Sequence, residues 1–310
     1  MKKYFFIWLI IAFIIAALFL VIKKYNQASL NAVNNIAFSD TSKVSTVEIM
    51  IGDENIILKR LKNDWVLENQ INVDKIKIND FFNVLSRMNV ESIIPAEFTD
   101  SLMNKAMVRL CHRQKKMKDY IFFKSDLYPG KTLLKFNSKE LFMVHTPGIY
   151  KSIYSYLHTS VDFWRDKTIV RLTSFDIHEV LIINHISNES YTLNLNPSNP
   201  SLILLDSDSI YTDLSKTSLS LFLAGFNNIQ AVGFIGDQNK LDSLRNTNPD
   251  YEIRIRHHEK NELALSIYPI FKNNSRNYDI CYCILNKEEL ALLKYVEIDP
   301  VIMDCRFFLR

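Results

Sequence analysis

The stretch Val44-Ser-Thr-Val-Glu-Ile-Met-Ile51 alternates apolar and polar side chains and runs into a Gly52-Asp53 turn. Period-two alternation of this kind is typical of a β-strand with one buried face. Two more apolar runs follow at 56–61 and 65–67, and polar turn residues separate each run from the next. The pattern therefore predicts a meander of three strands.

A helix is expected directly after these strands. Asp74 can cap it, because its side chain can accept hydrogen bonds from backbone N–H groups that have no partner within the helix. Apolar side chains then recur at three- and four-residue steps, as on the buried stripe of an amphipathic helix. They are Ile78, Phe81, Phe82, Leu85 and Met88. The order of elements is strand, strand, strand, helix.

The same order returns in the second half of the chain. The runs 177–183, 191–195 and 202–205 have strand character, and Asp213 precedes a second run with helical periodicity. The apolar residues of that run are Leu214, Leu219, Leu223 and Phe226. The repeat of four elements in one order suggests two copies of one structural unit.

The agreement continues beyond the two helices. Each half has a strand, a charged turn, a second strand, two further strands and a proline step. The first strand is 107–112 in the first half and 251–257 in the second, and the next strand is 120–123 or 263–270. The two further strands are 132–136 and 141–144 in the first half, and 279–285 and Tyr295–Ile298 in the second. The proline steps are Thr146-Pro147-Gly148 and Asp299-Pro300-Val301. The alternative is that any α+β chain produces similar strings of elements by chance.

These patterns predict an α+β fold made of two duplicated strand-rich modules, each a β-meander with one amphipathic helix. We place the first module at 44–157 and the second at 176–310, with a connector at 158–175 between them. A repeat of this length favours duplication of a whole domain rather than a solenoid of short repeats.

An apolar segment precedes the first module. Residues 4–22 contain no charged side chain and lie between two lysine pairs. As a helix they would span about 28 Å, close to the hydrocarbon thickness of a bilayer. A cleaved signal peptide is the alternative, but its apolar core is usually shorter and no small-x-small site follows here. We therefore expect a single-pass transmembrane anchor at 1–24 and a polar linker at 25–43.

The orientation of this anchor does not follow from charge, because the two lysine pairs balance each other. A short segment before the anchor and a long segment after it favour export of the long C-terminal segment. We expect the bulk of the chain on the periplasmic or extracytoplasmic side of the membrane.

Composition excludes several classes of protein. A chain of 310 residues allows about two domains, and 48% hydrophobic residues can bury a core, which excludes wholesale disorder. The net charge of +3 speaks against a nucleic-acid-binding protein. Six glycines in the whole chain leave little room for phosphate-binding loops.

Parts of the chain resemble domain-of-unknown-function family 4340. Residues 47–51, 56–61, 64–67 and the 74–90 helix are similar to the opening of that family, and 150–157, Phe163–Thr168 and 177–180 are similar to its midpoint. The likeness covers most of residues 45–235, although a Gly-Leu and proline step common in the family is absent near 98–107. The resemblance implies a bacterial envelope protein anchored in the inner membrane, without established catalysis, and often associated with ABC-type transport systems of the gliding-motility kind.

The densest cluster of functional side chains is Asp162-Phe163-Trp164-Arg165-Asp166. As a binding site, Arg165 would clamp an anion and a carboxylate would act as acid or base. As a structural element, Trp164 would bury its ring at the junction of the modules while Arg165 pairs with Asp162 or Asp166. The position between the repeats favours the structural interpretation, and Trp164, Arg165 and Asp166 are the candidate binding or junction residues.

Other motifs are weaker. Pro129-Gly130-Lys131-Thr132 resembles a phosphate loop, but Ser125 stands where that loop needs a glycine, so a hairpin turn is the better interpretation. The seven histidines show no spacing typical of metal ligands. No Gly-x-Ser-x-Gly nucleophile motif occurs in the sequence. We assign no catalytic residue, cofactor or metal from the sequence.

The four cysteines leave three interpretations open. Cys281 and Cys283 share one face of a strand and could bind a soft metal, or Cys111 could form a disulfide with a cysteine of the second half. Burial as small apolar core residues is the third interpretation and the commonest for free cysteine.

The function expected from the sequence is that of a non-catalytic scaffold or accessory subunit, and the first partner to test is an ABC-type transport complex. An envelope protein that binds a small ligand or peptide between the modules is the alternative. A hydrolase with dispersed Ser, His and Asp residues is the third hypothesis.

Overall fold

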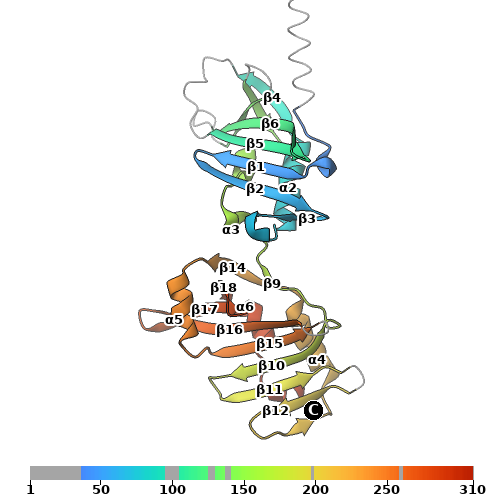
Figure 1. The fold of residues 1–310 in the computed structure, drawn as a ribbon, viewed down its shortest axis with the longest axis vertical. Helices are drawn as coiled ribbons and strands as arrows, with labels where there is room; N and C mark the ends of the chain where they lie inside the picture. Colours follow the sequence, from blue (N-terminus) through green and yellow to red (C-terminus); the bar gives the residue numbers. More distant parts are fainter. Residues whose placement is uncertain are drawn as a thin grey trace, which may run out of the picture. The chain divides into compact units, whose positions relative to one another are not determined.

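The computed structural model describes residues 36–94, 105–124, 130–136, 141–196, 199–257 and 261–309 (Figure 1). The chain divides into two compact units, a first unit that ends at Asp166 and a second unit that begins at Lys167. Both are strand-rich with few helices, so the α+β class predicted from the sequence is confirmed. The expected anchor at 4–22 lies outside the described residues, and no helix within the described ranges is long and apolar enough to cross a membrane.

An eight-stranded sheet forms the centre of the first unit (Figure 1). Its strands are β1 (Thr46–Ile51), β2 (Glu54–Leu61), β3 (Asp64–Val66), β4 (Asn89–Ile94), β5 (Lys105–His112), β6 (Lys115–Lys124), β7 (Thr132–Lys135) and β8 (Leu141–His145). In space they follow the order β3-β2-β1-β5-β6-β7-β8-β4, with antiparallel neighbours throughout. The helix α2 (Lys75–Ser86) connects β3 to β4, which lie at opposite edges of the sheet.

The second unit contains a ten-stranded sheet. Its strands are β9 (Thr168–Val170), β10 (Ile177–Asn184), β11 (Glu189–Asn194), β12 (Ser201–Leu204), β13 (Ile210–Tyr211), β14 (Ile229–Ile235), β15 (Tyr251–His257), β16 (Asn261–Lys272), β17 (Ser275–Leu285) and β18 (Glu289–Lys294). Their order in space is β13-β12-β11-β10-β15-β16-β17-β18-β14-β9. The helices α4 (Lys216–Ala224) and α5 (Gln238–Arg245) flank β14 in sequence.

The two sheets share one topology. Without β13 and β9, which stand at the two edges, the second sheet repeats the first strand for strand. The pairing of β4 with β8 shifts register between Val90 and Ser92, and the pairing of β14 with β18 shifts at the matching place, between Ala231 and Gly233. A β-bulge at the same point of two sheets is a specific structural feature, so the internal repeat predicted from the sequence is present in the fold.

The chain enters the two units through equivalent contacts. In the first unit the backbone N–H of Phe38 donates to the carbonyl of Leu85, at 3.0 Å. In the second unit the N–H of Leu172 donates to the carbonyl of Phe226, also at 3.0 Å. Both acceptors lie at the end of the helical segment that crosses the sheet, so the repeat extends to the residues before the first common strand.

The core of the first unit lies between α2 and one face of its sheet. Side chains alternate along a strand, so Val47 and Ile49 of β1 point to the same face, and both are fully buried. From α2, Ile78 and Phe81 are buried against this face. Removing one such side chain from water contributes about 1.5–3 kcal/mol.

The predicted cap of α2 is confirmed. The carboxylate of Asp74 accepts hydrogen bonds from the backbone N–H groups of Ile76, at 2.8 Å, and Lys77, at 3.3 Å. In the second unit Ser215 has the same role for α4, since its hydroxyl oxygen accepts from the N–H of Ser218 at 3.3 Å. These contacts satisfy helix N–H groups that have no backbone acceptor.

Helices contribute to both faces of the second sheet. Phe222 of α4 and Phe308 near the C-terminus are fully buried in the main core. On the opposite face, Leu241 and Leu244 of α5 pack with Ile284 of β17. This strand is therefore apolar on both sides.

One predicted strand is wrong. Tyr295–Ile298 forms a short helix, α6, and the strand equivalent to β8 is β18 at Glu289–Lys294. The sequence of β18 has no period-two pattern because both of its faces are covered. Leu290 packs in the α5 cluster, whereas Leu293 packs in the main core.

Two predicted boundaries also change. The end of the predicted 25–43 linker belongs to the first unit, because Ile36 is fully buried and Phe38 is 8% exposed. The predicted connector at 158–175 does not form a separate segment. It is divided at Asp166, so its first part belongs to the first unit and its second part, with β9, belongs to the second unit.

Candidate functional site

Trp164 lies in the interior of the first unit rather than at a junction of modules. Its ring is fully buried and meets the ring of Phe81 edge-on, with 5.7 Å between the centroids. Its Nε1–H donates to the carbonyl of His158 at 2.8 Å. A ring that is enclosed and hydrogen-bonded in this way contributes to stability, and it has no exposed surface for a ligand.

Arg165 and Asp166 continue this contact through their backbones. Arg165 forms a bridge with Val73 in the antiparallel sense, and the N–H of Asp166 donates to the carbonyl of Asn72 at 2.8 Å. The carbonyl of Trp164 accepts from the N–H of Asp74 at 2.8 Å. The predicted site residues therefore join the end of the first unit to the segment that leads into α2.

The sequence motif that resembles a phosphate loop lies in the connection between β6 and β7. Gly130 has φ of +77°, a value that favours glycine in turns. The ammonium of Lys131 pairs with the carboxylate of Glu91 at 2.8 Å, and the hydroxyl of Thr132 meets that of Ser152 at 2.6 Å. Both polar side chains thus have protein partners.

A hollow lies beside this turn. It has a volume of about 720 Å³ and is lined by residues of the segment 144–153 together with Glu91 and Lys131. The Nδ1 atom of His145 is buried and has no hydrogen-bond partner among the described residues. A buried polar atom without a partner costs free energy.

All four cysteines are free thiols. Cys281 and Cys283 are fully buried on one face of β17, within the main core of the second unit. Burial raises the pKa of the Cys281 thiol to about 12, and it raises the pKa of the Cys283 thiol as well. Thiols in this state stay protonated at neutral pH, which disfavours both metal binding and nucleophilic attack.

Within the described residues, three histidine side chains lie close to a carbonyl or carboxylate oxygen. His112 Nδ1 lies 2.5 Å from the carbonyl of Lys43, and His158 Nε2 lies 2.9 Å from that of Ser155. His185 Nε2 lies 3.2 Å from the carboxylate of Glu252. None of these three contacts pairs a histidine with a hydroxyl or thiol nucleophile, as a catalytic dyad requires.

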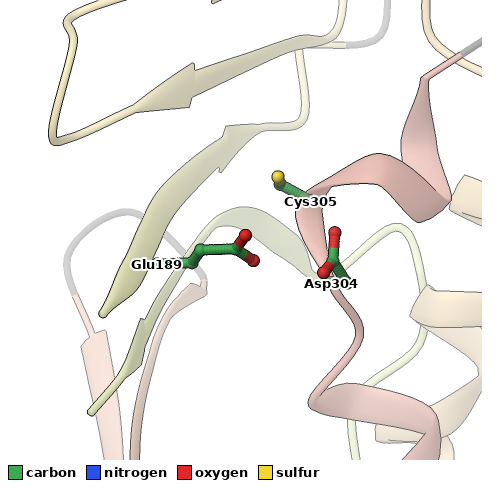
Figure 2. A group of neighbouring side chains, drawn as sticks. All are labelled: Glu189, Asp304 and Cys305. Atoms are coloured by element: carbon green, nitrogen blue, oxygen red, sulfur yellow. The ribbon is translucent and has the colours of Figure 1, made fainter. Parts of the chain in front are cut away.

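One cluster of potential ligand atoms was not predicted from the sequence. Glu189 at the start of β11 and Asp304 and Cys305 near the C-terminus bring a carboxylate, a second carboxylate and a thiol within 4.8 Å of one another (Figure 2). Asp304 and Cys305 are adjacent, but Glu189 lies more than one hundred residues earlier. No local spacing in the sequence could reveal the group.

The contacts of this cluster indicate a structural role. Arg306 donates to Glu189 at 3.2 Å and pairs with Asp304 at 3.5 Å. The carboxylate of Asp304 also accepts from the backbone N–H of Arg306, a hydrogen bond that lowers the pKa of Asp304. Burial raises the pKa of Cys305. The guanidinium therefore already pairs with both carboxylates, and the thiol stays protonated.

Comparison of the chain with protein-family models, with curated proteins and with solved structures found no match. The resemblance of residues 45–235 to domain-of-unknown-function family 4340 therefore stays a prediction.

Proposed function

We propose that this protein is a single-pass membrane protein of the bacterial envelope that binds a protein partner and catalyses no reaction. Residues 4–22 anchor it in the inner membrane, and the two units lie on the extracytoplasmic side. The first partner to test is a subunit of an ABC-type transport complex, which is the association that the family resemblance implies.

The observation that carries this proposal is the apolar character of the sheet edges. In the second unit β13 is an edge strand, and its residues Ile210 and Tyr211 are 65% and 38% exposed. In the first unit β4 is an edge strand, and Ile93 is 46% exposed. Edge strands present backbone N–H and C=O groups to which a partner strand can add, and exposed apolar side chains favour such pairing.

The buried thiols and tyrosines support a non-catalytic role. Lys118, whose pKa is lowered to about 8, already donates to the carbonyls of Ile36 and Ala37. The buried thiols are protonated, and burial also raises the pKa of the buried tyrosines Tyr120 and Tyr191. Groups activated for catalysis usually have a pKa shifted towards the working pH, not away from it. The three histidine contacts described above supply no base to a nucleophile.

The test is purification of the full chain from its membrane in mild detergent, followed by mass spectrometry. We expect transporter subunits with the wild type and a loss of at least tenfold with Ile210→Lys combined with Tyr211→Lys, because charges on an edge strand oppose strand addition. The matched control is Leu221→Lys on α4, a residue that is 61% exposed but belongs to no strand. Equal recovery with both variants, or no transporter subunit with the wild type, would contradict the proposal.

Binding of a small ligand is the second candidate function, favoured by the hollow at His145. A ligand that fills this hollow beside His145 would stabilise the first unit, since binding to the folded state alone raises stability. The test is a thermal unfolding screen of wild type and His145→Phe with small polar metabolites. A ligand that stabilises both proteins equally does not use this hollow.

A further inference from the structure

The residues through which the chain enters the first unit lie against strand β6. We call residues 36–45 the entry segment. Lys118 Nζ donates to the carbonyls of Ile36, at 3.2 Å, and Ala37, at 2.9 Å. The hydroxyl of Tyr120 donates to the carbonyl of Ile36 at 2.8 Å. These contacts hold Ile36 and Ala37 against β6.

The turn of this hairpin touches the other end of the entry segment. His112 Nδ1 lies 2.5 Å from the carbonyl of Lys43, and the N–H of Arg113 donates to the hydroxyl oxygen of Ser45 at 2.9 Å. The N–H of Ser45 donates to the carbonyl of Cys111 at 2.9 Å. The hairpin turn therefore contacts the C-terminal end of the entry segment, and β6 contacts its N-terminal end.

This hairpin is strongly basic. The segment His112–Lys118, which we call the basic hairpin, contains four lysine or arginine residues and no acidic one. Arg113, Lys115 and Lys116 are exposed. Lys116 pairs with Asp119 at 3.2 Å, whereas Arg113 and Lys115 form no ion pair with the described residues.

The second unit provides an internal comparison. The equivalent hairpin joins β15 to β16, and its segment 257–262 contains one lysine and two glutamates. The sheet topology does not require basic residues at this turn, because the same turn in the second unit is not basic. The positive charge is confined to the unit that follows the apolar segment.

Few residues separate the apolar stretch from the buried Ile36. Between the apolar stretch that ends at residue 22 and the buried Ile36 there are 13 residues, 23–35. A chain of this length spans at most about 45 Å. We propose that the basic hairpin of the first unit binds the anionic headgroups of the lipid bilayer that holds residues 4–22, an inference that rests on the proposed membrane anchor.

Anionic lipid fits this surface for two reasons. The hairpin carries exposed cations without an apolar patch, which suits attraction to a charged surface rather than insertion into it. Each lysine or arginine near an anionic bilayer strengthens binding by about fivefold, and the attraction acts within about 10 Å at moderate salt. The 13-residue connection limits the distance between the hairpin and the bilayer, and the exposed cations provide the electrostatic attraction.

The test measures trypsin cleavage after Arg113 in the full chain, which is incorporated into nanodiscs. One set of nanodiscs contains phosphatidylcholine alone, and the other contains about 30% phosphatidylglycerol. We expect cleavage after Arg113 to be at least tenfold slower in the anionic nanodiscs, with the difference lost in 0.5 M NaCl, where the screening length is about 4 Å. Cleavage after Lys272 is the internal control, because both turns have two central residues with positive φ.

Variants separate the charge of the hairpin from that of the whole molecule. In Lys115→Gln with Lys116→Gln, which keeps Arg113 as the cleavage site, we expect less than threefold protection by anionic lipid. Lys216→Gln with Lys294→Gln is the matched control, since both lysines are exposed in the second unit. The control should keep the full tenfold protection.

The outcomes distinguish this proposal from the one on which it rests. A chain that incorporates into neither kind of nanodisc would overturn the membrane anchor, and with it the lipid contact. A chain that incorporates into both, but is cut after Arg113 at the same rate in both, would overturn the lipid contact and leave the anchor standing. Equal protection from cleavage at Arg113 and Lys272 would also overturn the lipid contact.

Discussion

Lys118 shows how one side chain can differ between two copies of a unit. Its equivalent in the second unit is Leu263. Lys118 pairs with Leu110 of β5, and Leu263 pairs with Ile255 at the matching position of β15. Lys118 Nζ lies 4.8 Å from the ring centroid of Phe136 and 5.4 Å from that of Tyr120. Burial among these rings lowers the pKa of Lys118 to about 8.

A pH dependence of stability follows from this lowered pKa. Below about pH 8 the lysine is charged in both the folded and unfolded states, so its desolvation costs stability. Between pH 8 and the ordinary value near 10.5, the unfolded state holds more protons, so stability rises with pH. We expect this rise to be about 1 kcal/mol after allowance for solvent screening.

The measurement compares wild type with Lys118→Leu by urea unfolding at pH 7.5 and pH 10. Trp65 and Trp164 both lie in the first unit, so tryptophan fluorescence follows its unfolding. The rise between the two pH values should be about 1 kcal/mol smaller in Lys118→Leu. The control is Lys105→Leu, at an exposed position of β5. If both variants keep the wild-type pH dependence, Lys118 is not its source.

At the scale of elements, the end of α4 depends on a glycine. Gly225 has φ of −59°, which any residue can adopt. Glycine is needed here because there is no room for a Cβ atom, not because of the backbone conformation. A Cβ atom there would lie 2.7 Å from Cγ1 of Val301 and 3.0 Å from Cβ of Pro300. The close approach lets the C-terminal turns pack on the end of this helix.

We expect Gly225→Ala to destabilise the second unit by about 1–3 kcal/mol, because the added methyl group overpacks the contact with Val301. Gly236→Ala is the control, since a Cβ atom there meets nothing within 4 Å. It should be neutral or stabilising by less than about 1 kcal/mol. Amide hydrogen exchange of β14 and β18 measures both effects, and equal protection in the two variants would show that the space at Gly225 is not limiting.

At the scale of the whole molecule, each unit has a core made of its own residues. The core cluster of the first unit runs from Ile36 to Trp164, and that of the second unit runs from Val170 to Phe308. A unit with its own core can fold without the rest of the chain. The boundary between Asp166 and Lys167 is therefore expected to separate two units that fold independently.

Two fragments of the second unit test this boundary. Residues 167–310 should fold alone, whereas 176–310 should be about 2–5 kcal/mol less stable, because it lacks β9 and the buried Val170 and Leu172. Urea unfolding monitored by far-ultraviolet circular dichroism gives both values. Equal stability of the two fragments would place β9 outside the folded unit.

How much could be predicted from the sequence depends on the range of each contact. The β1–β2–β3 meander and the cap at Asp74 were predicted, because alternation and capping act between residues close in the chain. The strand β18 was missed, because both of its faces are covered and its pattern has no period. The Glu189 cluster and the interior position of Trp164 were also missed, since their partners lie far away in sequence and Trp164 was assigned to the connector.

The sequence by itself determined the α+β class, the presence of an internal repeat and the first helix cap, since periodicity and turn residues encode each of these locally. Only the tertiary structure decided that β4 and β14 pair with the last strand of their hairpin series, β8 and β18, with a bulge at the same point. It also decided that Ile36 is buried in the first unit and that Lys118 lies beside it. These features depend on which strands meet across long loops, and local side-chain preferences carry little information about that choice.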